Sequence, residues 1–313
     1  MKKITLIISI LIIVSTNKAE SQQIPLFSQY MFNGTYINPA YTGSRDALFA
    51  NLLYRKQWIG FNGAPQTAMF SIDGSLARGS NIGFIYVNDQ IGANYTNSFM
   101  ADYAFRFNVS NAGRLSFGLS GGFVNYGVNK SKLTSYDDRI DPNVGNTENI
   151  WKPSIDAGIY FDMKNFYAGL SVLGIISSKA DKNKATMHIV RAKANYFLTV
   201  GGSISLSDKV KFLPSTLLKS DFQNPVNVDV NAMLQVNEKY WIGGSYRTGV
   251  LWFTDVDKET RQYDAISLIL EALVTDRIRL GVAYDFDLTK ISNNNNGSIE
   301  LSVGYYFTKP KRK

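Results

Sequence analysis

The chain of 313 residues contains no cysteine and only one histidine, His188. Without cysteine there is no disulfide framework, so stability must come from packing and hydrogen bonds. Zinc and copper sites use several Cys or His ligands, so no transition-metal site is expected. A phosphate-binding glycine loop ending in Gly-Lys-Ser/Thr is also missing, and we expect the protein to work without a cofactor.

Long apolar runs are missing beyond the N-terminus. The run Ile4–Val14 is about half of the roughly 20 residues that a spanning helix needs. It follows two lysines and precedes small residues, which predicts a signal peptide over residues 1–21, cleaved after Ser21 during Sec export. Cleavage would remove three lysines and one glutamate, so the formal net charge would fall from +8 to +6. The remaining basic residues form no dense patch, which argues against nucleic-acid binding. Any membrane crossing must therefore use strands.

Apolar and polar residues alternate along much of the chain, as in strands with two different faces. In Ser298–Phe307, every second residue from Ile299 is apolar, and the residues between them are small or polar. We expect about fourteen such strands, an even number that suits a bacterial outer-membrane barrel. Their expected ranges are Asp46–Lys56, Gln66–Leu76, Asn81–Asp89, Thr96–Val109, Arg114–Val128, Lys152–Met163, Phe166–Ile176, Arg191–Leu206, Lys209–Asp221, Val226–Asn237, Tyr240–Val250, Tyr263–Val274, Arg277–Leu288 and Ser298–Phe307.

A secreted β-sandwich would show the same alternation, because its strands also bury one face. Aromatic residues near strand ends favour the barrel, since they would form girdles at the two membrane surfaces: Tyr54, Trp58, Tyr160, Phe161, Tyr240, Trp241, Tyr305 and Phe307. The charges expected on the lumen face are of mixed sign: Asp102, Arg106, Asp156, Asp162, Arg191, Lys193, Asp229, Arg247, Arg279, Asp285 and Asp287. Mixed signs fit ion pairs across the lumen or a plug, and they predict little conductance.

Two motifs could indicate a catalytic serine or a calcium site, but each has a simpler structural explanation. Gly118–Gly122 matches the nucleophile-elbow pattern, but the residues after it continue a strand, and His188, the only candidate base, lies in a polar stretch. The acidic stretch Tyr136–Asn146 fits no calcium loop and has the composition of a solvated loop. We therefore expect no catalytic residues and no bound metal, with a lipid hydrolase as the distant alternative.

Several segments closely resemble the PorP/SprF family of outer-membrane proteins associated with type IX secretion and gliding motility. They are Phe27–Asn33, Asn38–Gly43, Tyr54–Trp58, Gly63–Thr67, Pro214–Lys219, Trp241–Arg247 and Gly297–Phe307. The resemblance implies a non-enzymatic component of a secretion and motor complex, with some members paired with one large secreted adhesin. It supplies no catalytic residues. One departure from the family pattern is the basic tail 309–313, which would be a solvated stub or a periplasmic contact.

Residues 22–44 hold aromatic and amide residues without clean alternation, so we expect a docking or plug segment before a barrel at 45–308. Phe27, Tyr30, Phe32 and Tyr41 are expected to pack into the lumen or against a periplasmic partner. Arg55 and Trp58 would be partner contacts, or a rim arginine beside a girdle tryptophan. The predicted role is an integral outer-membrane barrel that binds a secreted adhesin, contacts outer-membrane lipid and links the adhesin to the type IX machinery. The alternative is a passive porin-like channel.

Overall fold

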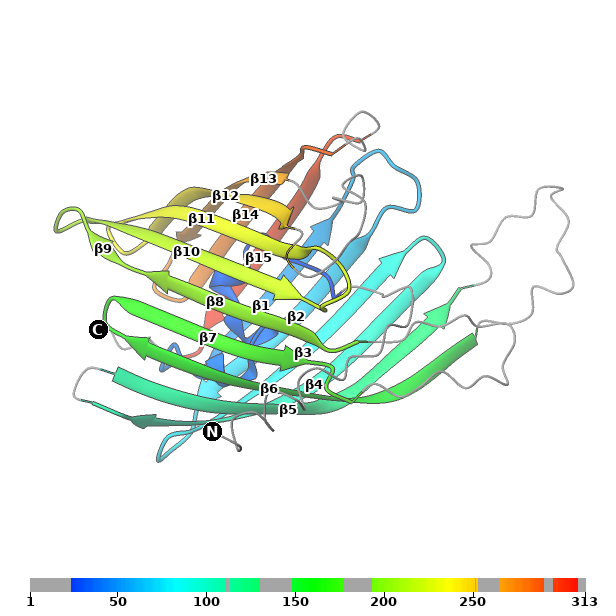
Figure 1. The fold of residues 1–313 in the computed structure, drawn as a ribbon. Coiled ribbons are helices and arrows are strands. Elements are labelled where there is room, and N and C mark those ends of the chain that lie inside the picture. Colours follow the sequence, from blue (N-terminus) through cyan, green and yellow to red (C-terminus); the bar gives the residue numbers. More distant parts are fainter. Residues whose placement is uncertain are drawn as a thin grey trace, which may run out of the picture.

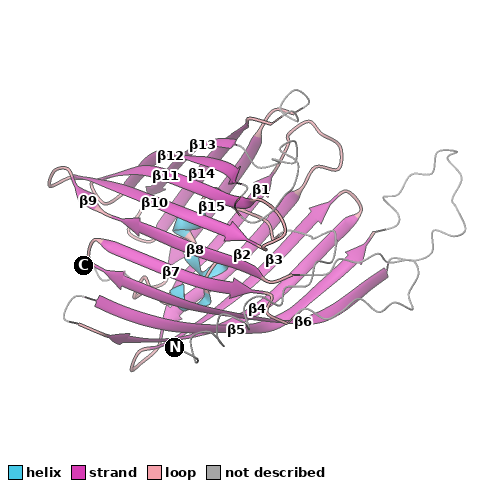
Figure 2. Ribbon diagram, viewed as in Figure 1, coloured by secondary structure: helices cyan, strands magenta, loops and turns pink. Residues whose placement is uncertain are grey.

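The computed structural model describes residues 24–110, 113–129, 148–176, 193–250, 252, 265–289 and 295–308. These residues form one closed antiparallel β-barrel (Figure 1) with three short 3-10 helices inside it (Figure 2). Within the described part of the chain, no helix is long and apolar enough to cross a membrane. The predicted signal peptide, the basic tail, His188 and the acidic stretch 136–146 lie outside the described residues.

The barrel wall is built from the strands in sequence order. The strands are β1 (Phe49–Lys56), β2 (Gln66–Ser75), β3 (Ser80–Ile91), β4 (Asn94–Asn108), β5 (Gly113–Val128), β6 (Glu148–Met163), β7 (Phe166–Leu173), β8 (Asn195–Gly202), β9 (Ile204–Ser205), β10 (Val210–Ser220), β11 (Val226–Val236), β12 (Tyr240–Val250), β13 (Ala265–Leu273), β14 (Ile278–Asp287) and β15 (Ser298–Tyr306). The 3-10 helices η1 (Tyr30–Phe32), η2 (Gly34–Tyr36) and η3 (Pro39–Tyr41) precede them.

The first and last strands close the barrel by pairing with each other, β1 with β15. Strands β8 and β9 both pair with β10 and are separated by Ser203 alone, so they occupy one position in the wall. The wall therefore has 14 strands, which confirms the predicted fold and count. The boundaries agree within a few residues, although β6 begins at Glu148, before the expected Lys152.

Alternation along the strands separates a polar lumen from an apolar outer face, as predicted. In β11, Asn227, Asp229 and Asn231 are buried inside the wall, whereas Val230 and Leu234 are exposed on the outside. A charged side chain at the lipid-facing midplane would cost roughly 2–4 kcal/mol for Arg or Lys, which explains why the charges gather on the inner face.

Two of the predicted girdle residues face the lumen instead. Tyr160 is buried, and Trp241 packs edge-on against Phe32 with 6.1 Å between ring centroids. Each has an aromatic neighbour in sequence, Phe161 or Tyr240. Because successive strand residues point to opposite faces, only one aromatic of each adjacent pair can face lipid, and the other enters the lumen.

The two ends of the barrel differ in their connections. At one end, here called the short-turn rim, tight turns such as 164–165, 237–239 and 274–277 join the strands. At the other end, the long-link rim, the strands are joined by longer connections, among them 57–65, 129–147 and 174–194. Short turns face the periplasm and long loops face outward in bacterial outer-membrane barrels, so the long-link rim is the outer one.

Candidate functional site: the segment inside the lumen

Residues 24–46, here called the lumen segment, run through the barrel from one end toward the other. Near the long-link rim, the carbonyl of Ile24 accepts a hydrogen bond from Lys219 Nζ at 2.7 Å. At the short-turn rim, Asp46 forms ion pairs with Arg114 at 2.8 Å and Arg106 at 3.4 Å. The segment therefore spans most of the height of the lumen before the chain enters β1.

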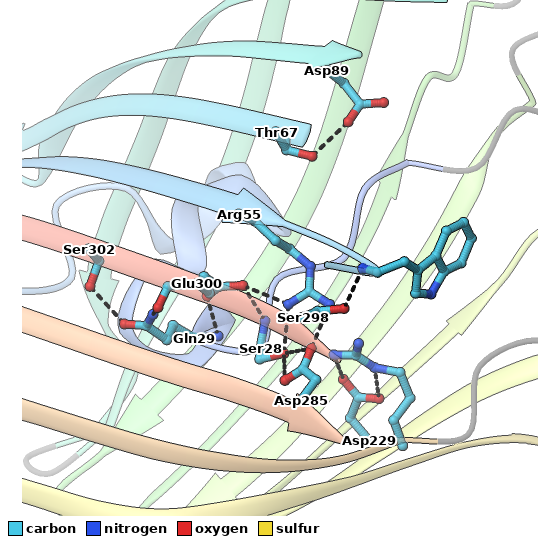
Figure 3. Close-up of polar contacts among 12 residues, drawn as sticks. Ser28, Gln29, Arg55, Thr67, Asp89, Asp229, Asp285, Ser298, Glu300 and Ser302 are labelled. Carbon is cyan, nitrogen blue, oxygen red and sulfur yellow. Dashed lines mark hydrogen bonds and ion pairs between the residues drawn. The ribbon is translucent and has the colours of Figure 1, made fainter. Parts of the chain in front are cut away.

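A buried ion-pair cluster holds the start of this segment to the wall (Figure 3). The backbone N–H groups of Ser28 and Gln29 donate to the Glu300 carboxylate at 2.9 and 2.8 Å. The Ser28 hydroxyl donates to Asp285 at 2.7 Å. Arg55 bridges the two acids, at 2.5 Å from Asp285 and 3.1 Å from Glu300. Charge-assisted bonds of this kind are stronger than neutral ones, and here they join β1, β14 and β15 to the segment.

A second ion pair lies close to the first. Arg247 of β12 donates to both carboxylate oxygens of Asp229 on β11, at 2.8 and 3.0 Å. With Arg55, Asp285 and Glu300, this gives two buried cations against three buried carboxylates, which leaves a formal charge of −1 on these five residues. The carboxylates are held by arginines and by N–H or O–H groups of the segment, which is how buried charges avoid a large desolvation penalty.

An apolar core fills the space between the segment and the wall. Phe27 and Tyr36 pack edge-to-face, with centroids 4.9 Å apart, and they belong to one buried cluster with wall residues that include Met69, Met100 and Phe197. Tyr30 lies in η1, outside the strands. Its burial, together with the nearby Asp229 carboxylate, holds the pKa of its hydroxyl well above the usual range, so this phenol stays uncharged. Among the described residues, the lumen thus contains a packed apolar core.

Wall glycines allow the segment to approach the strands closely. A Cβ at Gly118 would lie 2.2 Å from the Ala40 backbone nitrogen, and one at Gly158 would lie 2.1 Å from Asn38 Oδ1. Asn38 caps η3 by accepting from the Ala40 N–H at 2.9 Å, and its Nδ2 donates to the carbonyl of Ile159 at 3.0 Å. A side chain at either wall glycine would displace the Asn38–Ala40 turn.

The segment separates two cavities. The cavity toward the long-link rim has a volume of about 160 Å³ and is lined by residues such as Tyr36, Met100 and Leu173. The cavity toward the short-turn rim has a volume of about 330 Å³ and is lined by residues that include Phe32 and Trp241. The segment contributes residues to the lining of both cavities, Tyr36 to the first and Phe32 to the second.

The structure brings five of the six predicted contact residues into the lumen. Phe27, Tyr30 and Arg55 are buried. Phe32 packs on Trp241, and Tyr41 packs on Tyr160 at 5.2 Å between centroids. Trp58 lies apart from them in the 57–65 link at the long-link rim, where its backbone N–H donates to Ser298 Oγ at 3.2 Å. Binding of a partner by any of the six stays a prediction.

Sequence reasoning missed the residues that hold the segment, Ser28, Gln29, Asn38 and Glu300. Glu300 stands at an inward position of an alternating strand, and that signal marks a lumen charge. Its partners are the N–H groups of residues 272 and 271 positions earlier in the chain. No local pattern identifies such a pairing.

The structure places the nucleophile-elbow motif within β5, where Ser120 is buried and its Oγ donates to the carbonyl of Ala101 at 3.4 Å. A strained strand-to-helix turn is what this motif requires, and a continuous strand does not provide one. In the described ranges, no group of three or more His, Cys, Asp and Glu side chains is placed to hold a metal ion.

Comparison with solved structures shows the same fold in outer-membrane channels. The CymD monoaromatic hydrocarbon channel is 13% identical, with a TM-score of 0.51 over 93% of this chain and 94% of that chain. A TodX monoaromatic hydrocarbon channel deltaS2 mutant is 10% identical, with a TM-score of 0.50 over 90% and 94%. A Pseudomonas aeruginosa FadL homologue is 11% identical, with a TM-score of 0.48 over 91% and 95%. At such identities the likeness concerns the fold alone.

Comparison with curated proteins gave no match. The family model of the type IX secretion system membrane protein PorP/SprF matches residues 19–305, which is nearly the whole chain. This match confirms the resemblance found in the sequence motifs, and the barrel fold agrees with a place in the outer membrane. The chain therefore belongs to the PorP/SprF family of type IX secretion system membrane proteins.

Proposed function

We propose that this protein is a non-enzymatic docking component of the type IX secretion system, which binds a secreted surface adhesin and links it to the envelope machinery, including the gliding motor. Membership of the PorP/SprF family supports a role in secretion. The observation that carries the proposal beyond the family is the filled lumen: the segment 24–46 packs against the wall and is held by buried ion pairs. A barrel closed in this way is suited to binding at its rims.

The filled lumen also weighs against the alternative of a passive porin-like channel. A diffusion pore needs a continuous aqueous path. Here Arg55 instead bonds to the carboxylates of Asp285 and Glu300 and to Ser28 of the segment. We propose that residues 22–44 form a plug, that residues 45–308 form the barrel that carries it, and that the plug aromatics hold it in place. Trp58, at the long-link rim, is then the predicted residue best placed to meet a secreted partner.

The test is retention of a secreted protein at the cell surface. Intact cells carrying the tagged barrel are cross-linked, the barrel is purified, and the chains joined to it are identified. We expect a secreted surface protein and periplasmic type IX components, and we expect deletion of the barrel gene to release that surface protein into the medium. Trp58→Ala should weaken the retention, whereas Phe307→Ala at the opposite rim serves as the matched control. Unchanged surface retention after deletion of the gene would overturn the proposal.

A further inference from the structure

The outer surface of the barrel changes in character near the long-link rim, over strands β3 to β5. The register places three aromatic residues in one outward row across these strands, Tyr86, Phe99 and Phe123. One step nearer to the rim, the outward row consists of three asparagines, Asn88, Asn97 and Asn125. Neither row contains a charged residue. An aromatic band is thus followed by a band of neutral amides.

These two bands mark the level of the membrane surface. Tyr86 and Phe99 pack with 4.8 Å between ring centroids, and Trp151 of β6 stacks on Phe99 at 5.9 Å. Phe123 is 58% exposed and Trp151 56% exposed, so both rings face outward. Aromatic side chains gather where lipid meets water, and amides prefer the water side of that boundary. The asparagine row therefore lies at the depth of the headgroups of the outer leaflet.

Hydrogen bonds between the side chains hold these amides in place. Asn97 Oδ1 accepts from Asn88 Nδ2 at 2.7 Å and from the Tyr86 hydroxyl at 3.0 Å. Gln90 Nε2 donates to Asn88 Oδ1 at 3.2 Å. An amide carries two N–H donors and an acceptor oxygen, so an ordered network of amides presents both kinds of group at fixed positions on the surface.

A cavity of about 210 Å³ adjoins this network. It is lined by the β3–β4 hairpin and by Asn129, and every polar side chain among its described lining residues is neutral: Asn88, Gln90, Asn94, Tyr95, Asn97 and Asn129. The ring of Tyr95 covers Gly127 of β5, because a Cβ there would lie 2.1 Å from the Tyr95 Cζ atom. The glycine thus lets this ring lie against the wall, where it forms one side of the cavity.

Neutral amides beside an aromatic ring suit an uncharged sugar. A sugar hydroxyl both donates and accepts hydrogen bonds, and an amide offers donors and an acceptor to match it. The C–H groups on one face of a sugar ring are apolar and pack on an aromatic ring. An anionic ligand would need a cation, and the described lining residues include none. A wholly apolar ligand would cover the amides without replacing their bonds to water, which costs free energy.

We propose that this cavity binds a neutral sugar unit of a glycolipid headgroup in the outer leaflet. Tyr95 stacks on the sugar ring, and the amides of Asn94 and Asn97 bond to its hydroxyls. A soluble polysaccharide would present the same chemistry, but the position of the cavity at headgroup depth favours the glycolipid. This site is separate from the docking function proposed above and does not depend on it.

Binding is measured by calorimetry on the purified protein in phospholipid nanodiscs. The probe is the neutral fraction of the sugar chains released by mild acid from the native outer-membrane glycolipid. We expect saturable binding that changes little between about 50 and about 500 mM salt, because an uncharged ligand is not screened. Asn94→Ala removes an exposed lining amide and should weaken binding about tenfold. The matched control is Asn108→Ala, an exposed amide at the opposite end of the same strand, which should bind like wild type.

A second pair of variants separates stacking from hydrogen bonding, after all variants are shown to form heat-resistant barrels. Tyr95→Phe keeps the ring and should bind within about threefold of wild type, whereas Tyr95→Ala should bind about tenfold more weakly. Secreted polysaccharide from the culture medium, titrated in the same way, should bind more weakly than the glycolipid sugar chains, and stronger binding would overturn the glycolipid as the source. A wild type without saturable binding, or equal losses in Asn94→Ala and Asn108→Ala, would overturn the site itself. Neither result bears on the retention of a secreted surface protein.

Discussion

Removal of the Arg55 side chain should loosen the lumen segment. In Arg55→Ala, Asp285 and Glu300 lose the cation that bridges them at 2.5 and 3.1 Å. The Arg55 side chain is 4% exposed and its partners 1% and 0%, so solvent screens these charges little. Removing one partner of a buried ion pair costs about 3–5 kcal/mol. If about 3 kcal/mol of this cost destabilises the docked segment relative to the released segment, the released population rises about a hundredfold.

The absence of cysteine makes this prediction simple to measure. Phe27→Cys places a single thiol at a position that is 1% exposed, and a water-soluble maleimide labels it only when the segment leaves its site. Labelling should accelerate about a hundredfold when Arg55→Ala is added. The matched control is Lys211→Ala, which removes an exposed ion pair with Glu238 and should leave the rate nearly unchanged. Equal labelling rates with and without Arg55 would refute the claim that buried charges hold the segment.

Three further predictions concern the wall and the plug. Gly118→Val should displace the turn at Ala40 and raise ion conductance in planar bilayers, because even a Cβ would lie 2.2 Å from the Ala40 nitrogen; a variant as silent as wild type would contradict this. Val230→Arg on the lipid face should cost roughly 2–4 kcal/mol of folding free energy in vesicles and Leu206→Arg near the short-turn rim about 0–1, so equal costs would argue against the proposed membrane position. Asn38→Ala should lower the stability of the docked segment by about 1–2 kcal/mol, seen as faster amide exchange there, and unchanged exchange would mean that its cap and wall bonds contribute little.

The sequence predicts which wall residues face the lumen and which face lipid, because apolar and polar residues alternate within each strand. The inward position of Asp285 and the outward position of Leu301 follow from period-2 alternation within a few residues of each. Adjacent aromatics such as Tyr160 and Phe161 are ambiguous, because residue type alone does not say which of the two faces lipid. Alternation resolves them only when the register of the strand is known.

The arrangement inside the lumen was much harder to predict. The bond from the Ser28 N–H to Glu300 joins residues 272 positions apart, and nothing local in either segment encodes it. The close contact between Gly118 and the Ala40 turn becomes visible only once the segment is in place. Aromatic and amide residues in 22–44 indicate a docking segment without specifying the surface against which it packs.

Single-channel recording most directly tests whether the lumen segment blocks ion flow through the barrel. Purified wild-type protein in planar bilayers is compared with a variant that lacks residues 24–44, after both are shown to form heat-resistant barrels. We expect the wild type to conduct very little and the variant to show large, stable conductance, because the variant lacks the segment that fills the lumen through ion pairs and apolar contacts. A wild type that already conducts as freely as the shortened chain would contradict it.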